Sequence, residues 1–254
     1  MTILDRFSLL DKVAIVTGAS SGLGAAFAIA VAEAGASVAI GARRSERLAQ
    51  TGAAVAAKGA RVLSASCDVT LPGDCDALVS RTMDEFGRVD ILINNAGVAS
   101  AIPAIRETPE QFRSVIDVNL MGSYWMAQAC ARVMLPGSSI INIGSVLGST
   151  TASMPQAAYS ASKAAIAGLT RDLAQQWMGR KGIRVNAVAP GFFRTEMTDE
   201  YPDGYLDSVV VPRVPAGRTG ELRECATVVV FLASDAASYI NGVVLPVDGG
   251  LLIT

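Results

Sequence analysis

The sequence predicts a doubly wound α/β fold, in which a parallel sheet of seven strands carries helices on both faces. Short runs rich in Val and Ile, typical of strands that are buried on both faces, alternate with longer helix-favouring stretches. Short loops join these elements, and no low-complexity linker separates them. We therefore expect residues 1–254 to form a single domain, with right-handed crossovers between the strands.

The expected elements place several motifs at one edge of the sheet. Strands are expected at residues 12–17, 37–41, 61–66, 90–93, 139–144, 183–188 and 243–247. Helices are expected near residues 22–34, 44–58, 72–86, 108–134, 157–180 and 220–233. Ligands of such sheets bind beyond the carboxyl ends of the strands. Residues of the motifs follow five of these ends, and so predict a ligand site there: Gly18, Asp68, Asn94, Ser145 and Pro190.

A glycine-rich turn, T17-G-A-S-S-G-L-G24, joins the first strand to the first helix. Gly18 permits a tight turn, Gly22 lets a ligand approach the backbone, and Gly24 lets the helix pack against the sheet. The N–H groups at the start of the helix then offer a site for a pyrophosphate. The spacing differs from G-x-G-x-x-G, and an ordinary βα turn that needs glycine is the alternative interpretation.

Tyr159 and Lys163, in the run Y159-S-A-S-K163, stand four residues apart on one face of a predicted helix. An unperturbed phenol has a pKa of about 10, which is too high for ready proton exchange at neutral pH. An ammonium group one turn away favours the phenolate, so we expect Lys163 to lower the pKa of Tyr159. Such a pair would serve as a general acid and base, although the same spacing also occurs on solvated helices.

Composition narrows the class of protein. Apolar residues make up 51% of the chain, enough for a large core, and no apolar run is long enough to span a membrane. The net charge of −2 gives no reason to expect nucleic-acid binding. The N-terminal segment lacks signal-peptide features and the four cysteines lack C-x-x-C spacing, so a cytoplasmic protein with reduced cysteines is expected. The absence of histidine excludes histidine-based triads, and no metal site is expected.

Further motifs follow in order along almost the whole chain, and with them the sequence resembles the short-chain dehydrogenase/reductase family. These motifs are T17–G24, Asp68-Val69, N94-N-A-G97, Asn119, Ser145, Y159–K163, P190-G191 with Thr195, and D248-G-G250. The ordered set is far more specific than any one motif. The resemblance implies a Rossmann-like fold and an NAD(P)-dependent enzyme that interconverts a secondary alcohol and a ketone by hydride transfer.

The resemblance also implies four catalytic residues. Ser145 would donate a hydrogen bond to the substrate oxygen, and Tyr159 would be the acid in reduction and the base in oxidation. Lys163 would also bind the nicotinamide ribose, and Asn119 would hold a water that links Lys163 to solvent. The structural alternatives are a serine that satisfies the end of a strand and a satisfied core asparagine. A bent or hydrated helix at Asn119 is compatible with both interpretations of Asn119, as a residue that holds a water and as a satisfied core asparagine.

The resemblance implies more residues for the cofactor site than for catalysis. Asp68 would accept from the adenine amino group, and Thr195 would bond the carboxamide or the diphosphate. Asn94 is expected to tie neighbouring strands together, although ordinary loop roles stay open for Asn94 and Gly97. The expected cofactor-binding residues are Gly18, Ser20, Ser21, Gly22, Leu23, Gly24, Arg43, Asp68, Val69, Asn95, Ala96, Gly97, Tyr159, Lys163, Pro190, Gly191, Phe193 and Thr195.

The end of the second strand bears on the choice of cofactor. An NAD-preferring site needs an acid here, whereas this chain has Ala42 followed by Arg43 and Arg44. A guanidinium group can bind a 2′-phosphate in a bidentate fashion and stack on adenine. Arg43 is the better candidate, because it directly follows the position that the family uses for discrimination. We therefore expect NADP to be preferred and NAD to be possible; the alternative is an arginine pair that only solvates a helix start.

Residues 192–217 predict a mobile substrate-binding lid with two short helices, because glycine and proline breaks interrupt the segment. Its aromatic residues supply apolar surface, while Arg194 and Arg213 could meet an anion. A small alcohol or ketone is the expected substrate, and the sequence does not choose between a sugar, a steroid and an acyl thioester. Excess apolar surface on helices 108–134 and 157–180, together with the resemblance, predicts a homotetramer.

Two other classes of protein stay open as alternatives. A non-catalytic, dinucleotide-binding regulatory protein has the same fold, but the intact set of Ser145, Tyr159, Lys163 and Asn119 favours an enzyme. A dinucleotide-linked epimerase or dehydratase shares Tyr-x-x-x-Lys, but the few residues after the last strand leave little room for a second, substrate-binding domain.

Overall fold

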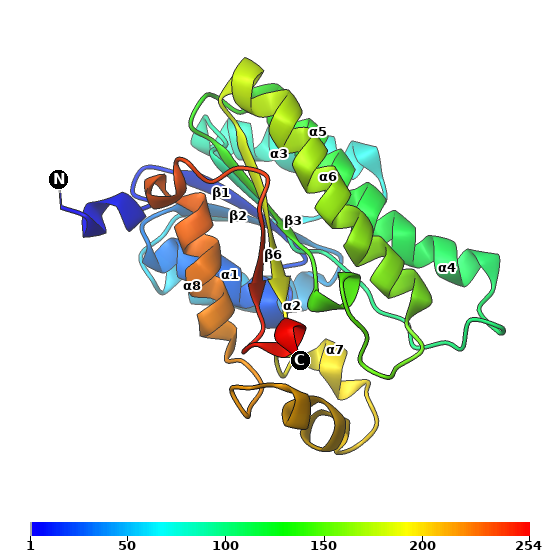
Figure 1. Cartoon of the computed structure of the whole chain (residues 1–254). Helices are drawn as coiled ribbons and strands as arrows, with labels where there is room; N and C mark the ends of the chain where they lie inside the picture. Colours follow the sequence, from blue (N-terminus) through cyan, green and yellow to red (C-terminus); the bar gives the residue numbers. More distant parts are fainter. Residues whose placement is uncertain (1) are drawn as a thin grey trace.

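The computed structural model describes residues 2–254, and over this range the chain folds around one parallel sheet of seven strands (Figure 1). The strands lie in the order β3-β2-β1-β4-β5-β6-β7. Each predicted strand is confirmed to within two residues at either end. Their bounds are β1 (Val13–Thr17), β2 (Ser37–Ala42), β3 (Val62–Ser66), β4 (Ile91–Asn94), β5 (Ser139–Ile143), β6 (Arg184–Pro190) and β7 (Val244–Val247).

Helices fill the stretches between the strands. The α-helices are α1 (Gly22–Glu33), α2 (Ser45–Ala56), α3 (Pro72–Phe86), α4 (Pro109–Ile116), α5 (Gly122–Val133), α6 (Ala157–Lys181), α7 (Glu196–Asp199) and α8 (Leu222–Ala233). Shorter 3-10 and π turns are η1 (Leu4–Phe7), η2 (Asp117–Met121), η3 (Val146–Gly148), η4 (Leu206–Val210), η5 (Val211–Arg213), η6 (Asp235–Ala237) and η7 (Leu251–Ile253). Each helix within residues 2–254 is too short or too polar to cross a membrane.

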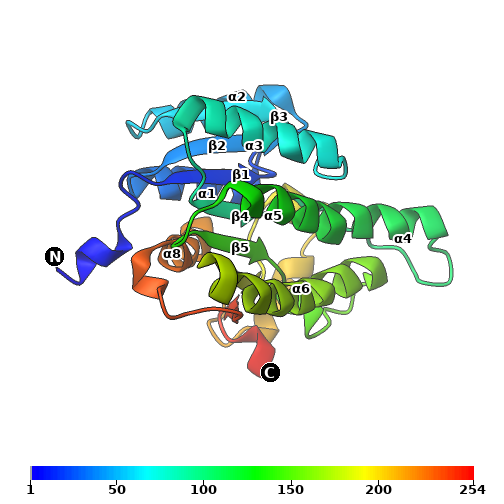
Figure 2. The same ribbon diagram turned by 90° about the horizontal axis from the view of Figure 1, so that it is seen from above.

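The helices form two layers on opposite faces of the sheet (Figure 2). Helices α1, α2 and α8 cover one face, and their Phe27 and Val229 share a buried cluster with Val16 of β1. Helices α3, α5 and α6 cover the other face, where Met126 shares a second cluster with Ile15. Successive residues of β1 thus point into different clusters, as in a strand that is covered on both sides. The predicted doubly wound architecture is confirmed.

Side-chain bonds reinforce the end of β4. Asn94 Nδ2 donates to Asn142 Oδ1 of β5 at 2.9 Å and to the carbonyl oxygen of Ser123 in α5, also at 2.9 Å. Both asparagines are buried. The expectation that Asn94 ties neighbouring strands is therefore confirmed, and the tie fixes where the next loop leaves the sheet.

The helix predicted over residues 108–134 contains a π turn. Thr108 caps α4, because its hydroxyl accepts from the Gln111 N–H and the Gln111 side chain accepts from the Thr108 N–H at 2.9 Å. The π turn η2 then separates α4 from α5 and contains Asn119. A π turn accommodates one extra residue and widens the helix locally. The predicted helix is therefore confirmed as a contiguous helical run over residues 109–133, with a π turn where a bend had been considered.

A third apolar cluster lies at the carboxyl edge of the sheet. It joins Tyr159 of α6 and Leu147 of η3 to Phe192 and Leu206 in the segment 192–217, which holds α7, η4 and η5. This segment crosses below the sheet in Figure 1. The third cluster therefore holds the segment 192–217 against the start of α6.

Candidate active site

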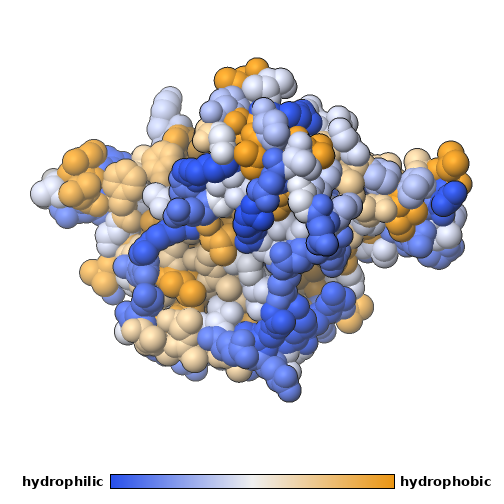
Figure 3. Space-filling view, turned by 90° about the horizontal axis from the view of Figure 1, so that it is seen from below, coloured by the Kyte–Doolittle hydropathy of each residue, from blue (hydrophilic) through white to orange (hydrophobic). Residues whose placement is uncertain are grey.

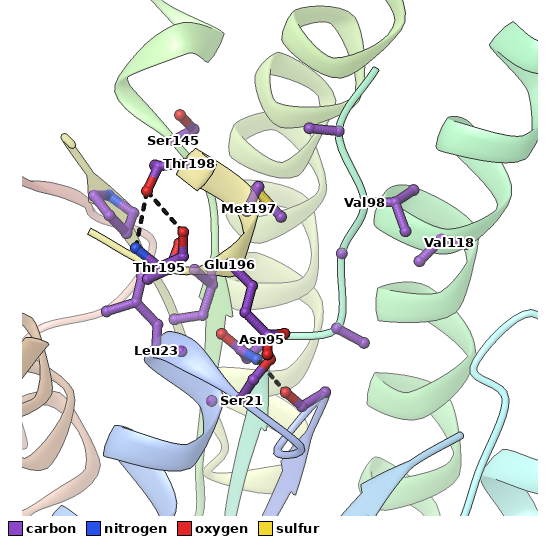
Figure 4. Close-up of a pocket in the computed structure, with 18 of the residues that line it drawn as sticks. Ser21, Leu23, Asn95, Val98, Val118, Ser145, Thr195, Glu196, Met197 and Thr198 are labelled. Carbon is purple, nitrogen blue, oxygen red and sulfur yellow. Dashed lines mark hydrogen bonds between the residues drawn. The ribbon is translucent and has the colours of Figure 1, made fainter. Parts of the chain in front are cut away.

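A cavity of about 530 Å³ lies at the carboxyl edge, where β1 and β4 are neighbours and the order of the strands reverses. Figure 4 shows Ser21, Asn95 and Val98 around it, with Glu196 of α7 across the space between them. Every residue predicted to bind the cofactor lines this cavity together with Ser145: Gly18, Ser20, Ser21, Gly22, Leu23, Gly24, Arg43, Asp68, Val69, Asn95, Ala96, Gly97, Tyr159, Lys163, Pro190, Gly191, Phe193 and Thr195.

The glycine-rich turn packs too tightly for side chains at Gly18 and Gly24. A Cβ at Gly24 would lie 2.4 Å from Asn95 Nδ2, and one at Gly18, where φ is +64°, would lie 2.7 Å from the Cα of Ala96. The Asn95 amide holds the turn, because it donates to the carbonyl oxygens of Thr17 at 3.0 Å and Gly18 at 3.2 Å. These glycines therefore allow the turn to pack directly on the loop after β4.

The donors around this turn fit the diphosphate of a dinucleotide. The first N–H groups of α1 have no intrahelical acceptor and lie at the positive end of the helix dipole. The hydroxyls of Ser20 and Ser21 line the cavity beside them and accept from the Arg44 guanidinium at 3.1 and 2.7 Å. Together, N–H, hydroxyl and guanidinium groups provide the chemistry that binds phosphates. We call residues 18–24, 42–44 and 67–69 the cofactor side of the cavity.

Asp68 presents a carboxylate on the cofactor side. Its Oδ1 accepts from the N–H and the hydroxyl of Thr70 at 3.0 and 2.8 Å, and its Oδ2 lies 3.9 Å from Arg43. Burial acts to raise the pKa of Asp68, but the hydrogen bonds from Thr70 and the charge of Arg43 together lower it below its ordinary value. Asp68 is therefore an ionised acceptor at neutral pH.

Ser145, Tyr159 and Lys163 meet in the same cavity. Ser145 follows β5, and α6 presents Tyr159 and Lys163 one turn apart, both buried. The Ser145 hydroxyl accepts from the Leu147 N–H at 3.1 Å and lies near enough to Tyr159 to lower the pKa of the phenol in part. Lys163 Nζ donates to the carbonyl oxygen of Ile143 at 2.7 Å and lies 5.7 Å from the centre of the Tyr159 ring. A hydroxyl, a phenol and an amine thus converge on one point.

The pKa of Tyr159 differs from the sequence-based expectation. Burial raises the pKa of Tyr159 to about 12, against the nearby Ser145 hydroxyl, which lowers it. Burial also lowers the pKa of Lys163 to about 8. Both shifts favour the neutral form of a group removed from water. The predicted lowering of the Tyr159 pKa by Lys163 was wrong for this arrangement, because desolvation dominates and the amine is directed to the Ile143 carbonyl.

Asn119 lies outside the lining of the cavity and is fully buried in the π turn. Its Oδ1 accepts from the Val98 N–H at 2.8 Å, and its Nδ2 donates to the Val98 carbonyl and to Ser162 Oγ, both at 2.9 Å. Ser162 Oγ donates in turn to the Tyr159 carbonyl oxygen at 2.7 Å. Asn119 therefore ties the loop after β4 to α6 as a satisfied core asparagine, and its role with a bound water stays a prediction.

Sequence reasoning missed a charged cluster beside the cofactor side. Arg44 donates to Glu196 Oε2 at 3.0 Å, and Arg47 also pairs with Glu196. The position of Arg44 next to Arg43 could have indicated that Arg44 also lies at the cavity. Nothing in the local sequence indicates that Glu196 lies there. The cavity lining that was not predicted also includes Cys67, Val98, Ala99, Val118, Ile143, Gly144, Val146, Thr198 and Glu200.

Comparison with known proteins agrees with this site. A protein family described as "Enoyl-(Acyl carrier protein) reductase" matches residues 18–252. A 2-dehydro-3-deoxy-D-gluconate 5-dehydrogenase from Dickeya dadantii is 39% identical, over 98% of this chain and 99% of that protein. A short-chain type dehydrogenase/reductase from Mycobacterium marinum, known from a crystal structure, is 36% identical over 100% of both chains, with a TM-score of 0.95.

A further solved structure, a gluconate 5-dehydrogenase from Burkholderia cenocepacia in complex with NADP and tartrate, is 34% identical over 100% of both chains, with a TM-score of 0.91. The fold, the cavity and these likenesses define a dinucleotide-dependent oxidoreductase that interconverts secondary alcohols and ketones. The chain belongs to the short-chain dehydrogenase/reductase family.

Proposed function

We propose that this protein is an NADP-preferring reductase of ketones, and dehydrogenase of the matching secondary alcohols, with Tyr159 as its acid and base. The convergence of Ser145, Tyr159 and Lys163 on the cavity that the glycine-rich turn lines carries this proposal. A non-catalytic dinucleotide-binding protein would have no use for a buried phenol beside a serine and a buried amine at this place.

Each residue of the site has a separate role in the proposed reaction. The bound dinucleotide supplies the hydride in reduction and accepts it in oxidation. In reduction, Ser145 donates a hydrogen bond to the carbonyl oxygen, and Tyr159 transfers its phenolic proton to that oxygen as the alcohol forms. A pKa of about 12 keeps Tyr159 protonated at neutral pH and ready to donate. Lys163, one turn from Tyr159 on α6, would hold the nicotinamide ribose of the bound dinucleotide.

The preference for NADP rests on the end of β2. Ala42 is buried and carries no carboxylate that would repel a 2′-phosphate, and the guanidinium groups of Arg43 and Arg44 line the cofactor side. Arg44 also donates to Ser20 and Ser21 of the turn, so it would add a cation beside a bound dinucleotide phosphate. Two cations and no acid at this strand end favour NADP over NAD.

The assembly proposed with this function is a cytoplasmic homotetramer in which residues 192–217 cover the substrate. The outward face of α6 supports the assembly, because Ala161, Ala164 and Gly168 are exposed on it at helical spacing. A Cβ at Gly168 would meet no atom within 4 Å, so a partner helix has room to approach closely. Light scattering at micromolar protein tests the tetramer, and a monomeric mass would contradict it.

The decisive experiment follows oxidation of NADPH and NADH by the purified protein across a panel of ketones. We expect turnover with NADPH, a lower kcat/KM with NADH, and loss of turnover in Tyr159→Phe while NADPH still quenches protein fluorescence. Binding of NADPH without turnover of any ketone would instead support the non-catalytic regulatory protein.

A further inference from the structure

The part of the cavity around Tyr159 has an apolar lining. Residues of the third apolar cluster form it, and they come from the loops after β4 and β5 and from the segment 192–217. The tyrosine Tyr201 packs its ring 6.3 Å from Phe192 and 5.2 Å from Tyr205. We call the following residues the substrate side of the cavity: Val98, Ala99, Ser145, Val146, Leu147, Tyr159, Phe192 and Tyr201.

The cations that line the cavity are all assigned elsewhere. Among the described residues that form the lining, the basic ones are Arg43, Arg44 and Lys163. Arg43 and Arg44 lie on the cofactor side beside Asp68 and Ser20, and the amine of Lys163 is directed to the Ile143 carbonyl. The substrate side itself therefore presents no guanidinium or ammonium group for an anionic substrate.

The two arginines of the segment 192–217 do not supply the missing charge. Arg194 pairs with Asp207 at 2.5 Å, and Arg213 donates to the carbonyl oxygen of Thr151 at 2.8 Å. Both side chains lie outside the lining of the cavity. The sequence-based suggestion that they meet an anion in the site was wrong, because the segment folds with these arginines turned outward.

Glu200 adds a negative charge beside the substrate side. Glu200, just after α7, lines the cavity and is exposed, and its charge acts to raise the pKa of Tyr201. Figure 3 views the molecule from below and shows strongly hydrophilic residues in ridges with paler and apolar surface between them. A carboxylate on the substrate side would lie near the like charge of Glu200 and against apolar side chains that offer it no partner cation.

We propose that the substrate is an uncharged, apolar ketone, or the matching secondary alcohol, whose hydrocarbon part lies against the substrate side. This inference rests on the proposed function and names its substrate class. Burial of a carboxylate without a partner cation is costly, so a sugar acid of the kind named for the relatives in gluconate chemistry is disfavoured here. A carbonyl, by contrast, finds its hydrogen-bond donors in Ser145 and Tyr159.

The test uses three aryl ketones that differ in one substituent. Acetophenone is the neutral parent, 4-acetylbenzoate adds a carboxylate, and 4-acetylbenzamide has the shape of the benzoate without its charge. The measurements are kcat/KM with NADPH in the wild-type enzyme and, independently of turnover, the Kd of each ketone for Tyr159→Phe with bound NADPH by calorimetry.

We expect both neutral ketones to exceed the benzoate by about tenfold or more in kcat/KM and in affinity. Glu200→Gln should narrow this gap by about twofold to fivefold, whereas Asp84→Asn, which removes one negative charge from the exposed face of α3, should leave it unchanged.

Two results would overturn the inference: a benzoate that binds or reacts as well as the benzamide, or no measurable binding of either neutral ketone at millimolar concentration. Binding that follows the expected order without turnover in the wild type would uphold the substrate class and count against the proposed function instead.

Discussion

The cofactor side and the substrate side of one cavity are built by different means. On the cofactor side, backbone N–H groups, hydroxyls and guanidinium groups stand directly after β1, β2 and β3. On the substrate side, apolar side chains come from two loops and from the segment 192–217, which has little regular structure of its own. The first depends on where strands end, and the second on how loops fold over that edge.

This difference separates what the fold fixes from what it leaves free. Asn95 shows the constraint on the cofactor side, because it fills the space that side chains at Gly18 and Gly24 would need. Leu147 and Tyr201 are under no such constraint from the sheet, since exchange of their side chains leaves the strands in place. Membership of the family therefore predicts the cofactor site closely, while the substrate follows from local side chains.

The largest effect is expected at the point where the two sides meet. Tyr159→Phe removes the phenolic proton and leaves the ring in its apolar cluster, so kcat should fall by about 10²–10⁴-fold. The Kd for NADPH should be unchanged, because the cofactor side is intact. Stopped-flow reduction of a ketone and fluorescence titration with NADPH measure the two quantities. A kcat near that of the wild type would remove Tyr159 from the mechanism.

A second change rebuilds the cofactor side alone. Ala42→Asp combined with Arg43→Ser introduces an acceptor for the ribose hydroxyls, repels a 2′-phosphate and removes one cation. A charge-assisted hydrogen bond contributes about 1.5–3 kcal/mol, so each substitution should shift the NADP/NAD ratio of kcat/KM about tenfold to a hundredfold. The KM for the ketone should stay the same. A wild type that already prefers NAD would refute the role assigned to Arg43.

The buried amine of Lys163 predicts a pH dependence of stability. The pKa of Lys163 is about 8 in the folded chain and 10.5 ordinarily, so between these values the unfolded chain binds more protons. The free energy of unfolding therefore rises with pH in this window. Well below pH 8 Lys163 is protonated in both states, so it adds no pH dependence there. From pH 8 to 9.5 the wild type should gain on the order of 2 kcal/mol over Lys163→Met.

Urea unfolding at fixed protein concentration measures this difference, with Lys58→Met as the control at an exposed lysine. An equal pH dependence in all three proteins would mean that Lys163 is hydrated in solution. Lys163→Met should also weaken NADPH binding, which separates its contact with the ribose from its burial.

The smallest effect concerns α7, which borders both sides. Glu196 pairs with Arg44 and Arg47, and these side chains are about half exposed, so each pair contributes only about 0.2–1 kcal/mol. Glu196→Gln removes a negative charge near the arginines and should tighten NADPH binding about twofold to fivefold, with no change for NADH. Parallel fluorescence titrations check this, and an equal gain for both cofactors would refute an effect on the 2′-phosphate.

The sequence predicted the cofactor side better than the substrate side for a physical reason. Strand ends and the glycine-rich turn depend on local patterns, so the positions of Gly18 and Asp68 after their strands were predicted from the sequence, while the resemblance added Ser21 and the role of Asp68. The outward turn of Arg194 and the pairing of Glu196 with Arg44 depend on how the segment 192–217 folds, which no periodicity records. Roles of individual residues in the reaction remain predictions until the variants above are measured.

Burial accounts for the failure at Tyr159 and Lys163. Their spacing was visible in the sequence, but the sign of the pKa shift depends on how completely the fold removes both groups from water. The pattern of apolar residues likewise does not reveal the π turn at Asn119, where Asn119 bonds Val98 in a loop distant in sequence.

The wide turn η2 also sets the rotational phase between two helices. An α-helix advances about 100° per residue, so an extra residue in a strictly regular helix would turn α4 by about 100° relative to α5. The π turn absorbs that residue locally, so Val115 keeps its place in the third apolar cluster while α5 keeps its place on the sheet. Insertion of a second residue here would exceed what one π turn absorbs and would displace a whole helix face, whereas substitution of Asn119 removes only one set of contacts.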